Sequence, residues 1–367
     1  MNEVNVTEEL KAVGEAFRLK GTYDRYELIT HGNINTTYRV FYRSPDKSYI
    51  FQKVNTYVFR QPENIMQNID LVTEHIRGKD KTAPSLHFHH TADGKNYLFG
   101  EDGKFWRVSN DIDSVTYQGS SDPEVLRQAG RAFGEFQLKL SDFDASLLHE
   151  TIPDFHNTKK RLEGFFKNVE KDEYGRVAEV KDEIEFIRSH RELASRLTEM
   201  YETGKIPARV THNDTKINNV LFDKESGAPL TVIDLDTVMP GLASHDFGDA
   251  VRFAANTAAE DEKDLSRVSL DLELYRSFAE GFISAAAPVL TDAELDTMAL
   301  GAVTIAIELG MRFLDDYITG DKYFTTHYEG HNLVRTRCQL TLAADMEKKL
   351  DTMNSIVAET AKKVREC

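Results

Sequence analysis

The first third of the chain contains short runs in which apolar and polar residues alternate, with turn-forming residues between them. Alternation with a period of two is typical of strands that bury one face, and longer stretches with helical spacing accompany these runs. The pattern predicts a small sheet with two helices. The predicted strands are Tyr26–Ile29, Thr37–Tyr42, Tyr49–Val54, Tyr97–Phe99 and Phe105–Val108, and the predicted helices are Leu10–Leu19 and Glu63–Ile76.

Beyond Tyr117 the apolar residues recur every three or four positions, which is the spacing of amphipathic helices. A sheet-forming part followed by a helical part predicts an α+β chain with two lobes, residues 1–108 and the larger 109–367. The predicted helices are those around Val125–Leu140 and over Val180–Tyr201, Asp264–Phe282, Asp292–Thr319 and Thr341–Lys362.

One β-hairpin is predicted inside the helical half. Asn219–Phe222 and Leu230–Ile233 are rich in branched and aromatic residues, and a turn-forming run separates them. Antiparallel pairing about the centre of that run puts Asn219 opposite Asp234, and Asp214 lies just before the open end. Three oxygen-bearing side chains are therefore expected to converge.

These three side chains suit phosphoryl transfer. The Asp214 carboxylate would bind and deprotonate an attacking hydroxyl, while Asn219 and Asp234 supply hard oxygen ligands of the kind that Mg²⁺ accepts. The spacing from Asp214 to Asn219 is that of the kinase catalytic loop, H-R-D-x-x-x-x-N, and Asp234–Asp236 stands where protein kinases have Asp-Phe-Gly. The arginine and the glycine of those motifs are absent. Taken singly, each residue also fits a turn or a cap, and Asp236 fits either the metal site or a solvated surface.

The loop and hairpin resemble those of small-molecule kinases of the aminoglycoside phosphotransferase and choline kinase superfamily. Within it, segments over nearly the whole chain resemble the N-acetylhexosamine 1-kinase family. The resemblance implies a bilobal protein-kinase-like fold, a nucleotide-binding N-terminal lobe, and Mg²⁺-dependent transfer from ATP to the anomeric C1 hydroxyl of N-acetylglucosamine or N-acetylgalactosamine. The segments that carry it are His31–Tyr38, Val210–Asn219, Ile233–Pro240, His245–Phe253, Gly310–Phe313 and His331–Arg337.

Composition adds limits on partners and location. The 367 residues are 40% hydrophobic and 29% charged, which is ordinary for a globular protein, and the formal charge of −16 argues against nucleic acid or anionic membrane as a partner. Cys338 and Cys367 are the two cysteines, so a disulfide framework is not expected. The N-terminus lacks the apolar core of a signal peptide, and Glu308 interrupts the most apolar run. We expect a soluble cytoplasmic protein, and the oligomeric state stays open.

The segment between the first two predicted strands lies where a kinase has its glycine-rich loop over the phosphates. Gly32 and Asn33 tolerate positive φ, and Asn35, Thr36 and Thr37 offer donors to phosphate oxygens. A plain hairpin turn has the same composition. Position and resemblance therefore carry the prediction of a phosphate-binding loop.

The strand Tyr49–Val54 is expected to carry the lysine that pairs the nucleotide phosphates. Alternation favours Gln52 at the inward position, with Lys53 as a surface residue, although the pattern leaves both open. A glutamine can donate a hydrogen bond but brings no charge. Adenine is expected to meet backbone groups just after the last strand of the sheet, with Ser109 and Ile112 among the contacts.

A sugar acceptor requires hydrogen-bonding partners and an aromatic or apolar surface, and Arg312, Asp316 and Tyr323 are of suitable types. Arg312 lies in a long apolar helix, where a charge implies a buried partner or a ligand. A structural salt bridge to Asp315 or Asp316 is one alternative. The resemblance favours the other, in which Arg312 and Tyr323 face the N-acetylhexosamine.

Asp246 and Asp249 come too late in the sequence to be a second Asp-Phe-Gly motif. We expect them to hold the catalytic loop by hydrogen bonds or to cap a helix over 250–258, with Arg252 as an ion-pair partner, while His212 braces the loop.

Two rival functions are compatible with the sequence. Another small-molecule kinase of the same fold would act on choline, homoserine or an aminoglycoside. The other rival is a catalytically silent nucleotide- or sugar-binding protein. It is suggested because Gln52, and not Lys53, is favoured at the inward position where a kinase has its phosphate-binding lysine.

Overall fold

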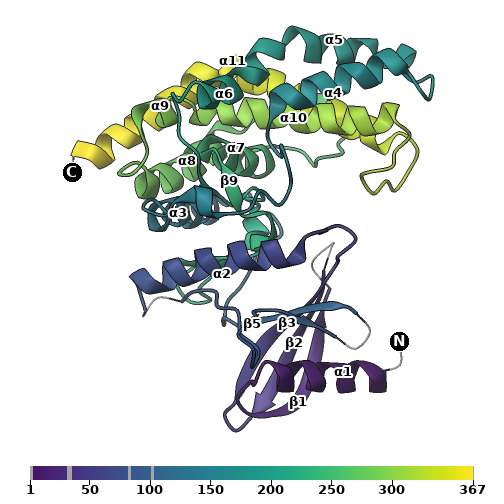
Figure 1. Cartoon of the computed structure of the whole chain (residues 1–367). Coiled ribbons are helices and arrows are strands. Elements are labelled where there is room, and N and C mark those ends of the chain that lie inside the picture. The colour runs from purple at the N-terminus through teal and green to yellow at the C-terminus, as the bar shows by residue number, and fades with distance from the viewer. Residues whose placement is uncertain (1–2, 31–34, 82–83, 101–102, 367) are drawn as a thin grey trace.

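The computed structural model of the chain describes residues 3–30, 35–81, 84–100 and 103–366. Its N-terminal part is a sheet whose strands are β1 (Thr22–Ile29), β2 (Thr36–Arg43), β3 (Lys47–Val54), β4 (Leu98–Phe99) and β5 (Phe105–Asn110). The five strands are antiparallel neighbours in the order β1-β2-β3-β5-β4, and the rest of the chain is mainly helical (Figure 1). This arrangement confirms the predicted α+β class, with β5 running to Asn110 rather than ending at Val108.

The two faces of the sheet have different neighbours. Helix α1 (Glu3–Ala16) covers one face, where Leu10 joins Phe51 and Trp106 in a separate hydrophobic cluster. Helix α2 (Pro62–Lys79) lies between the sheet and the helical half (Figure 1). Apolar residues of α2 share one core with residues of both halves, so this helix joins the sheet to the rest of the molecule.

The helical half also contains two short two-stranded sheets. β6 (Arg209–Thr211) pairs with β9 (Met239–Gly241), and β7 (Val220–Phe222) pairs with β8 (Pro229–Val232). Short 3-10 helices occupy Ala145–Leu147, Val177–Glu179, Ile217–Asn219, Leu235–Thr237 and Leu265–Arg267. The α-helices are α3 (Pro123–Lys139), α4 (Thr158–Lys171), α5 (Lys181–Ser189), α6 (Arg191–Glu202), α7 (Ala243–Ala254), α8 (Leu272–Ala286), α9 (Asp292–Leu295), α10 (Met298–Ile318) and α11 (His331–Glu366).

Several predicted helix limits are wrong. The stretch 180–201 is two helices, α5 and α6, and α8 begins only at Leu272, because the Asp271 side chain caps it by accepting hydrogen bonds from two backbone N–H groups. α7 begins at Ala243, and the segment 331–337 forms the first turns of α11. Within the described part of the chain, no helix is long and apolar enough to cross a bilayer.

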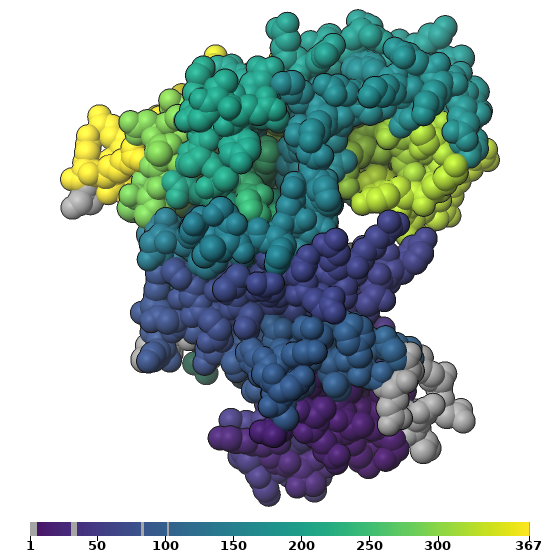
Figure 2. Space-filling model, viewed as in Figure 1, coloured from purple at the N-terminus to yellow at the C-terminus, as the bar shows by residue number. Residues whose placement is uncertain are grey.

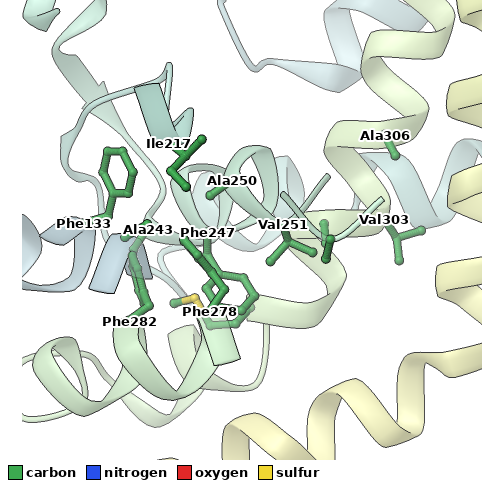
Figure 3. Close-up of a cluster of buried hydrophobic side chains, with 14 of the residues drawn as sticks. Phe133, Ile217, Ala243, Phe247, Ala250, Val251, Phe278, Phe282, Val303 and Ala306 are labelled. Carbon is green, nitrogen blue, oxygen red and sulfur yellow. The ribbon is translucent and has the colours of Figure 1, made fainter. Parts of the chain in front are cut away.

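Close packing of α7 on α10 fixes the elements behind the catalytic loop. A Cβ atom on Gly248 of α7 would lie 2.4 Å from the backbone carbon of Gly301 in α10, so only glycine permits this approach. Figure 3 shows Ile217 of the loop region in the same buried cluster as Phe247 of α7 and Phe278 of α8. The loop is therefore anchored in the main core from one side.

Candidate active site

The β7–β8 hairpin forms, with a register one residue away from the prediction. Val220 pairs with Val232, and the Ile233 N–H donates to the Asn219 carbonyl oxygen at 2.8 Å, so Asn219 lies opposite Ile233 rather than Asp234. An irregularity between the pairs made by Leu221 and Phe222 shifts the register. Asp234 follows in a left-handed conformation, with φ 61° and ψ 58°.

The predicted catalytic residues gather at the open end of this hairpin. The Asn219 Nδ2 group donates to Asp214 Oδ2 at 3.0 Å and to its carbonyl oxygen at 2.9 Å. Lys216 Nζ lies 2.9 Å from Asp214 Oδ1, a contact that the sequence analysis missed although Lys216 is only two residues further along the loop. Asp234 is close enough to Asp214 for the two carboxylates to interact electrostatically. The geometry thus brings Asp214, Asn219 and Asp234 together.

The Asp234 carboxylate has features expected of a cation ligand. The residue is exposed, yet many protein atoms surround its carboxylate, and this desolvation, with repulsion from Asp236 and Asp214, raises the pKa of Asp234 to about 6. Such a concentration of negative charge is relieved by a cation.

The donor set also fits Mg²⁺. Asn219 uses its amide nitrogen for hydrogen bonds to Asp214, and no described residue donates to its amide oxygen. Mg²⁺ bound with a nucleotide needs only one or two protein ligands, the others being phosphate and water oxygens. Among the described residues there is no cluster of three or more His, Cys, Asp or Glu that would hold a metal by itself, which is compatible with such a shared site.

Asp246 of α7 holds the catalytic loop, as predicted. Its carboxylate accepts hydrogen bonds from the backbone N–H groups of His212 and Asn213, both at 2.8 Å, and from Gln137 Nε2 at 3.2 Å. These bonds fix Asn213, whose φ of 61° is left-handed, immediately before Asp214. The direction of the Asp214 side chain is thus set from α7.

A second carboxylate of α7 holds the other side of the loop. Asp249 Oδ2 accepts from the Thr215 N–H at 3.2 Å, and Arg252 Nη2 donates to Asp249 Oδ1 at 2.8 Å, which confirms the expected ion pair. Asp246 and Asp249 lie inside α7, so a capping role at a helix over 250–258 is wrong. The expected bracing role of His212 is confirmed, because its Nε2 is 2.9 Å from the Ile233 carbonyl oxygen.

On the sheet side of the site, Gln52 and Lys53 lie on opposite faces of β3, as strand alternation predicts. The Lys53 ammonium lies 2.9 Å from Glu9 of α1 and 4.7 Å from the centre of the Trp106 ring, on the α1 face. Gln52 faces the opposite way and donates through Nε2 to Thr37 Oγ1 at 3.2 Å. No lysine of β3 therefore points toward the catalytic loop.

The residues predicted to bind phosphate have different positions. Gly32 and Asn33 lie outside the described residues. The Asn35 amide nitrogen donates to Asp236 Oδ2 at 2.8 Å, so this residue reaches the turn Asp234–Asp236, the expected metal-binding turn. Thr37 is on the face of Gln52, but Thr36 pairs with Lys53 in β2–β3 and shares its α1 face. Thr36 therefore lies on the face opposite to Gln52 and Thr37, and a phosphate contact by its hydroxyl stays a prediction.

A buried arginine was missed from the sequence. Arg107 of β5 is 2% exposed, pairs across the strands with Gln52, and donates through Nε to Gln52 Oε1 at 2.9 Å. Its Nη1 group forms an ion pair with Asp236 Oδ1, and Asp236 is 4% exposed. Asp236 is thus neither solvated nor free. The composition of β5 gave one signal, a charged residue between the apolar residues Trp106 and Val108.

The connection after the sheet offers one of the two expected adenine contacts. The Val108 carbonyl oxygen and the Asn110 N–H are bonded to residues on one side of β5, so the intervening Ser109 directs its backbone groups to β3, where it pairs with Ile50. Ser109 is therefore part of the ladder, and the prediction for it is wrong. The N–H of Ile112 donates to no described residue, so Ile112 stays a candidate.

Arg312 makes no ion pair with any described residue. Its guanidinium lies over three aromatic rings, at 5.5 Å from the centre of Phe155, 5.6 Å from Phe324 and 6.0 Å from Tyr323. Asp315 instead accepts from Asn168 Nδ2 at 2.9 Å. The alternative of a structural salt bridge from Arg312 to Asp315 or Asp316 is wrong.

Asp316 organises the loop after α10 rather than facing a ligand. Its Oδ1 accepts from the N–H groups of Lys322 and Tyr323, and its Oδ2 accepts from the N–H of Phe324 and from Asn332 Nδ2, at 2.8–2.9 Å. These four bonds saturate the buried carboxylate. The prediction that Asp316 contacts the substrate is replaced by an indirect role, holding Tyr323 near Arg312. Tyr323 itself is 73% exposed.

A second arginine lies beside Arg312. Burial and the nearby Arg312 lower the pKa of Arg161, whose Nε donates to the Phe155 carbonyl oxygen at 2.8 Å. Buried Glu308 lies 3.6 Å from Arg161 and binds His156 Nδ1 at 2.9 Å. Burial alone would raise the pKa of Glu308, but His156, Arg161 and Arg312 lower it to about 2, so the carboxylate stays ionised.

This cationic and aromatic cluster is connected to the catalytic loop through α7. The His156 ring is 5.0 Å from the ring of His245, which directly precedes Asp246. Figure 2 shows an opening between the purple-blue N-terminal half and the yellow-green part of the helical half. The cluster of Arg161 and Arg312 and the loop that carries Asp214 are thus linked through α7.

A model of the phosphotransferase enzyme family (APH) matches residues 25–280 of the chain. The chain belongs to this family. The matched range begins within β1 and contains the rest of the sheet, the catalytic loop, the hairpin and α7, whereas Arg312 and Tyr323 lie beyond it.

Solved structures resemble the phosphotransferase over almost its whole length. A microcompartment-associated aminopropanol kinase is 16% identical, with a TM-score of 0.61, and the match covers 94% of this chain and 98% of that one. Spectinomycin phosphotransferase bound to ADP and spectinomycin is 13% identical, with a TM-score of 0.54 and 98% of each chain covered. Choline kinase from Cryptosporidium parvum is 14% identical, with a TM-score of 0.52 and coverage of 92% and 93%. These likenesses show a shared fold.

Proposed function

We propose that this phosphotransferase is a Mg²⁺-dependent kinase that transfers the γ-phosphoryl group of ATP to the C1 hydroxyl of an N-acetylhexosamine. Asp214 binds the attacking hydroxyl and accepts its proton. Asn219 and Asp234 hold Mg²⁺, which when bound neutralises phosphate charge. The observation that carries the proposal is the convergence of these three residues at the end of one hairpin, and the acceptor is suggested by Arg312, which makes no ion pair with a described residue.

The loop geometry supports catalysis rather than silent binding. Asn213, directly before Asp214, has a left-handed backbone conformation, and the hydrogen bonds that Asp246 accepts from His212 and Asn213 hold it; Asp234 is left-handed as well. Strained backbone conformations held by buried hydrogen bonds are typical of functional sites. Lys216 beside Asp214 adds a positive charge near the reacting groups. A protein that only bound sugar would not need this arrangement.

The charge of the acceptor surface favours a sugar over an amine. Related structures are those of aminopropanol, choline and spectinomycin phosphotransferases, and their names indicate amine-bearing compounds. Here Arg161 and Arg312 lie together near the rings of Phe155 and Tyr323. Two arginines repel an ammonium group, whereas their N–H donors bind hydroxyl and carbonyl oxygens, and an aromatic ring packs on a sugar face.

A second acceptor class is favoured by the same arginines. A hydroxy amino acid such as homoserine presents a carboxylate, and the planar guanidinium of Arg312 can bind a carboxylate through two hydrogen bonds. We prefer the N-acetylhexosamine for two reasons. It is the acceptor of the family that the sequence segments resemble, and the rings of Tyr323 and Phe324 lie beside Arg312, where a sugar face can pack.

The proposal is tested by measuring ADP release with ATP, Mg²⁺ and one acceptor at a time. The acceptors are N-acetylglucosamine, N-acetylgalactosamine, homoserine, choline and kanamycin, with an Asp214→Asn variant as the control for background hydrolysis. We expect turnover with one or both sugars. Phosphorus–proton couplings in the NMR spectrum of the product then identify the phosphorylated carbon. Turnover of choline or kanamycin without sugar turnover, or a phosphate on a hydroxyl other than C1, would refute the proposal.

A further inference from the structure

Arg107 is a buried cation between the sheet and the metal-binding turn. Its side chain is held from one side by Gln52, through the 2.9 Å hydrogen bond from Nε, and from the other by the ion pair with Asp236. The Arg107 and Asp236 side chains are 2% and 4% exposed, and their ion pair joins residues from the two halves of the chain. The Arg107 charge also reaches Asp234, the expected metal ligand, where it partly opposes the rise in pKa that burial and the neighbouring carboxylates cause.

The guanidinium has hydrogen-bonding capacity that the protein leaves unused. Besides the bonds of Nε and Nη1, its neighbours are the Met66 sulfur at 3.9 Å from Nη1 and the Phe88 ring, whose centre is 5.6 Å away. Nη2 donates to no described residue. Nη2 is not among the described buried atoms that lack a hydrogen-bond partner, so it is open to an oxygen from outside the protein and can donate to a ligand.

The other cations on the described parts of β2 and β3 near this site are directed elsewhere. Lys53 pairs with Glu9 on the α1 face, and Arg39 pairs with Asp111 at 2.8 Å. The position where a kinase has its phosphate-binding lysine is instead the uncharged Gln52. Gln52 and Arg107 are cross-strand partners. The positive charge on this face therefore lies on β5, one strand away from the β3 position that carries it in kinases.

We propose that Arg107 binds the phosphates of the nucleotide in place of a β3 lysine, and that Gln52 orients its guanidinium. This inference rests on the proposed kinase function. Asp236 keeps the guanidinium in position in the absence of nucleotide, and Nη2 supplies the donor to a phosphate oxygen. The planar fork of arginine binds phosphate with defined geometry, so the site selects nucleoside di- and triphosphates over the free nucleoside.

The test compares nucleotide binding by the Arg107→Gln variant and the wild-type protein. ATP, ADP and adenosine are titrated calorimetrically in the presence of Mg²⁺. We expect the Kd values of ATP and ADP to rise about 10- to 100-fold, the range for losing a hydrogen bond to a charged group, while the Kd of adenosine changes less than about 2-fold. An unchanged ATP affinity, or equal losses for ATP and adenosine, overturns the inference, because a purely structural ion pair would affect both ligands alike.

Lys53→Gln is the matched control, since it removes one positive charge from the adjacent position of the same sheet on the opposite face. It is expected to leave the ATP affinity unchanged. The double variant Gln52→Arg with Arg107→Gln returns the charge to β3 and is expected to recover at least about 5-fold of the lost ATP affinity, within the strength of a charged hydrogen bond. No recovery in a folded double variant counts against the inference.

Two further measurements separate the possible failures. If Arg107→Gln does not fold, Arg107→Gln combined with Asp236→Asn removes the stranded carboxylate and is titrated against Asp236→Asn alone. The same phosphate-specific loss is expected, and its absence overturns the inference. A wild-type protein that binds no ATP overturns the proposed kinase function itself, whereas ATP binding that is indifferent to Arg107 overturns the present inference alone.

Discussion

The replacement of Arg312 by leucine separates a ligand-binding arginine from a structural one. The guanidinium contacts three aromatic rings and makes no ion pair with a described residue. Each cation–π contact at a partly exposed site contributes about 0.5–1 kcal/mol, and a leucine side chain keeps apolar packing against the same rings. We therefore expect the free energy of unfolding to fall by no more than about 1 kcal/mol. Breaking a buried ion pair would instead cost about 3–5 kcal/mol.

The effect on catalysis should be larger than the effect on stability. If the guanidinium donates one or two hydrogen bonds to the acceptor, each worth about 1.5–3 kcal/mol, the value of kcat/KM for the sugar falls about 10- to 100-fold or more. The KM for ATP should stay nearly constant, because the change lies on the acceptor surface.

The assay combines urea unfolding with steady-state kinetics in which sugar and ATP are varied separately. Arg337→Leu is the control, because Arg337 lies on α11 in a partly exposed ion pair with Glu183, at 2.6 Å, and its loss should cost less than about 1 kcal/mol. A stability loss of about 3–5 kcal/mol in Arg312→Leu, with normal sugar kinetics in the folded fraction, would show that the reasoning about Arg312 is wrong.

Three further predictions concern the catalytic loop and the metal-binding turn. Asp214→Asn should lower kcat about 10²-fold or more with an unchanged circular dichroism spectrum, and a fully active variant would exclude its catalytic role. Asp234→Ala should abolish turnover at any practical Mg²⁺ concentration without loss of stability, whereas Asp236→Ala strands buried Arg107 and should cost about 3–5 kcal/mol in urea unfolding; equal stabilities would contradict the ion pair. Asp246→Asn turns an amide donor toward a backbone N–H of the loop, so we expect a loss of about 2–3 kcal/mol and a lower kcat; wild-type values for both would mean that other contacts fix the loop.

Much of the local structure could be predicted from the sequence, because it depends on neighbouring residues. Strand alternation placed Gln52 and Lys53 on opposite faces, and the five-residue interval from Asp214 to Asn219 placed both at the end of one hairpin. The hairpin register was missed by one residue, because an irregularity at Leu221 has no clear signature in composition. Helix ends were missed where a cap such as Asp271 decided the first turn.

The sequence by itself therefore determined the order of sheet and helices and the types of residue at the catalytic loop. Which carboxylate accompanies which cation was decided by the tertiary structure. Arg107 and Asp236 are 129 residues apart, and Arg312 lacks the partner that Asp316, only four residues away, might have provided in a helix. Asp316 instead binds the backbone of the following loop. The strength of an ion pair depends on the distance between the two charges and on their burial, and folding sets both. A periodic pattern along the chain specifies only which face of an element a residue occupies.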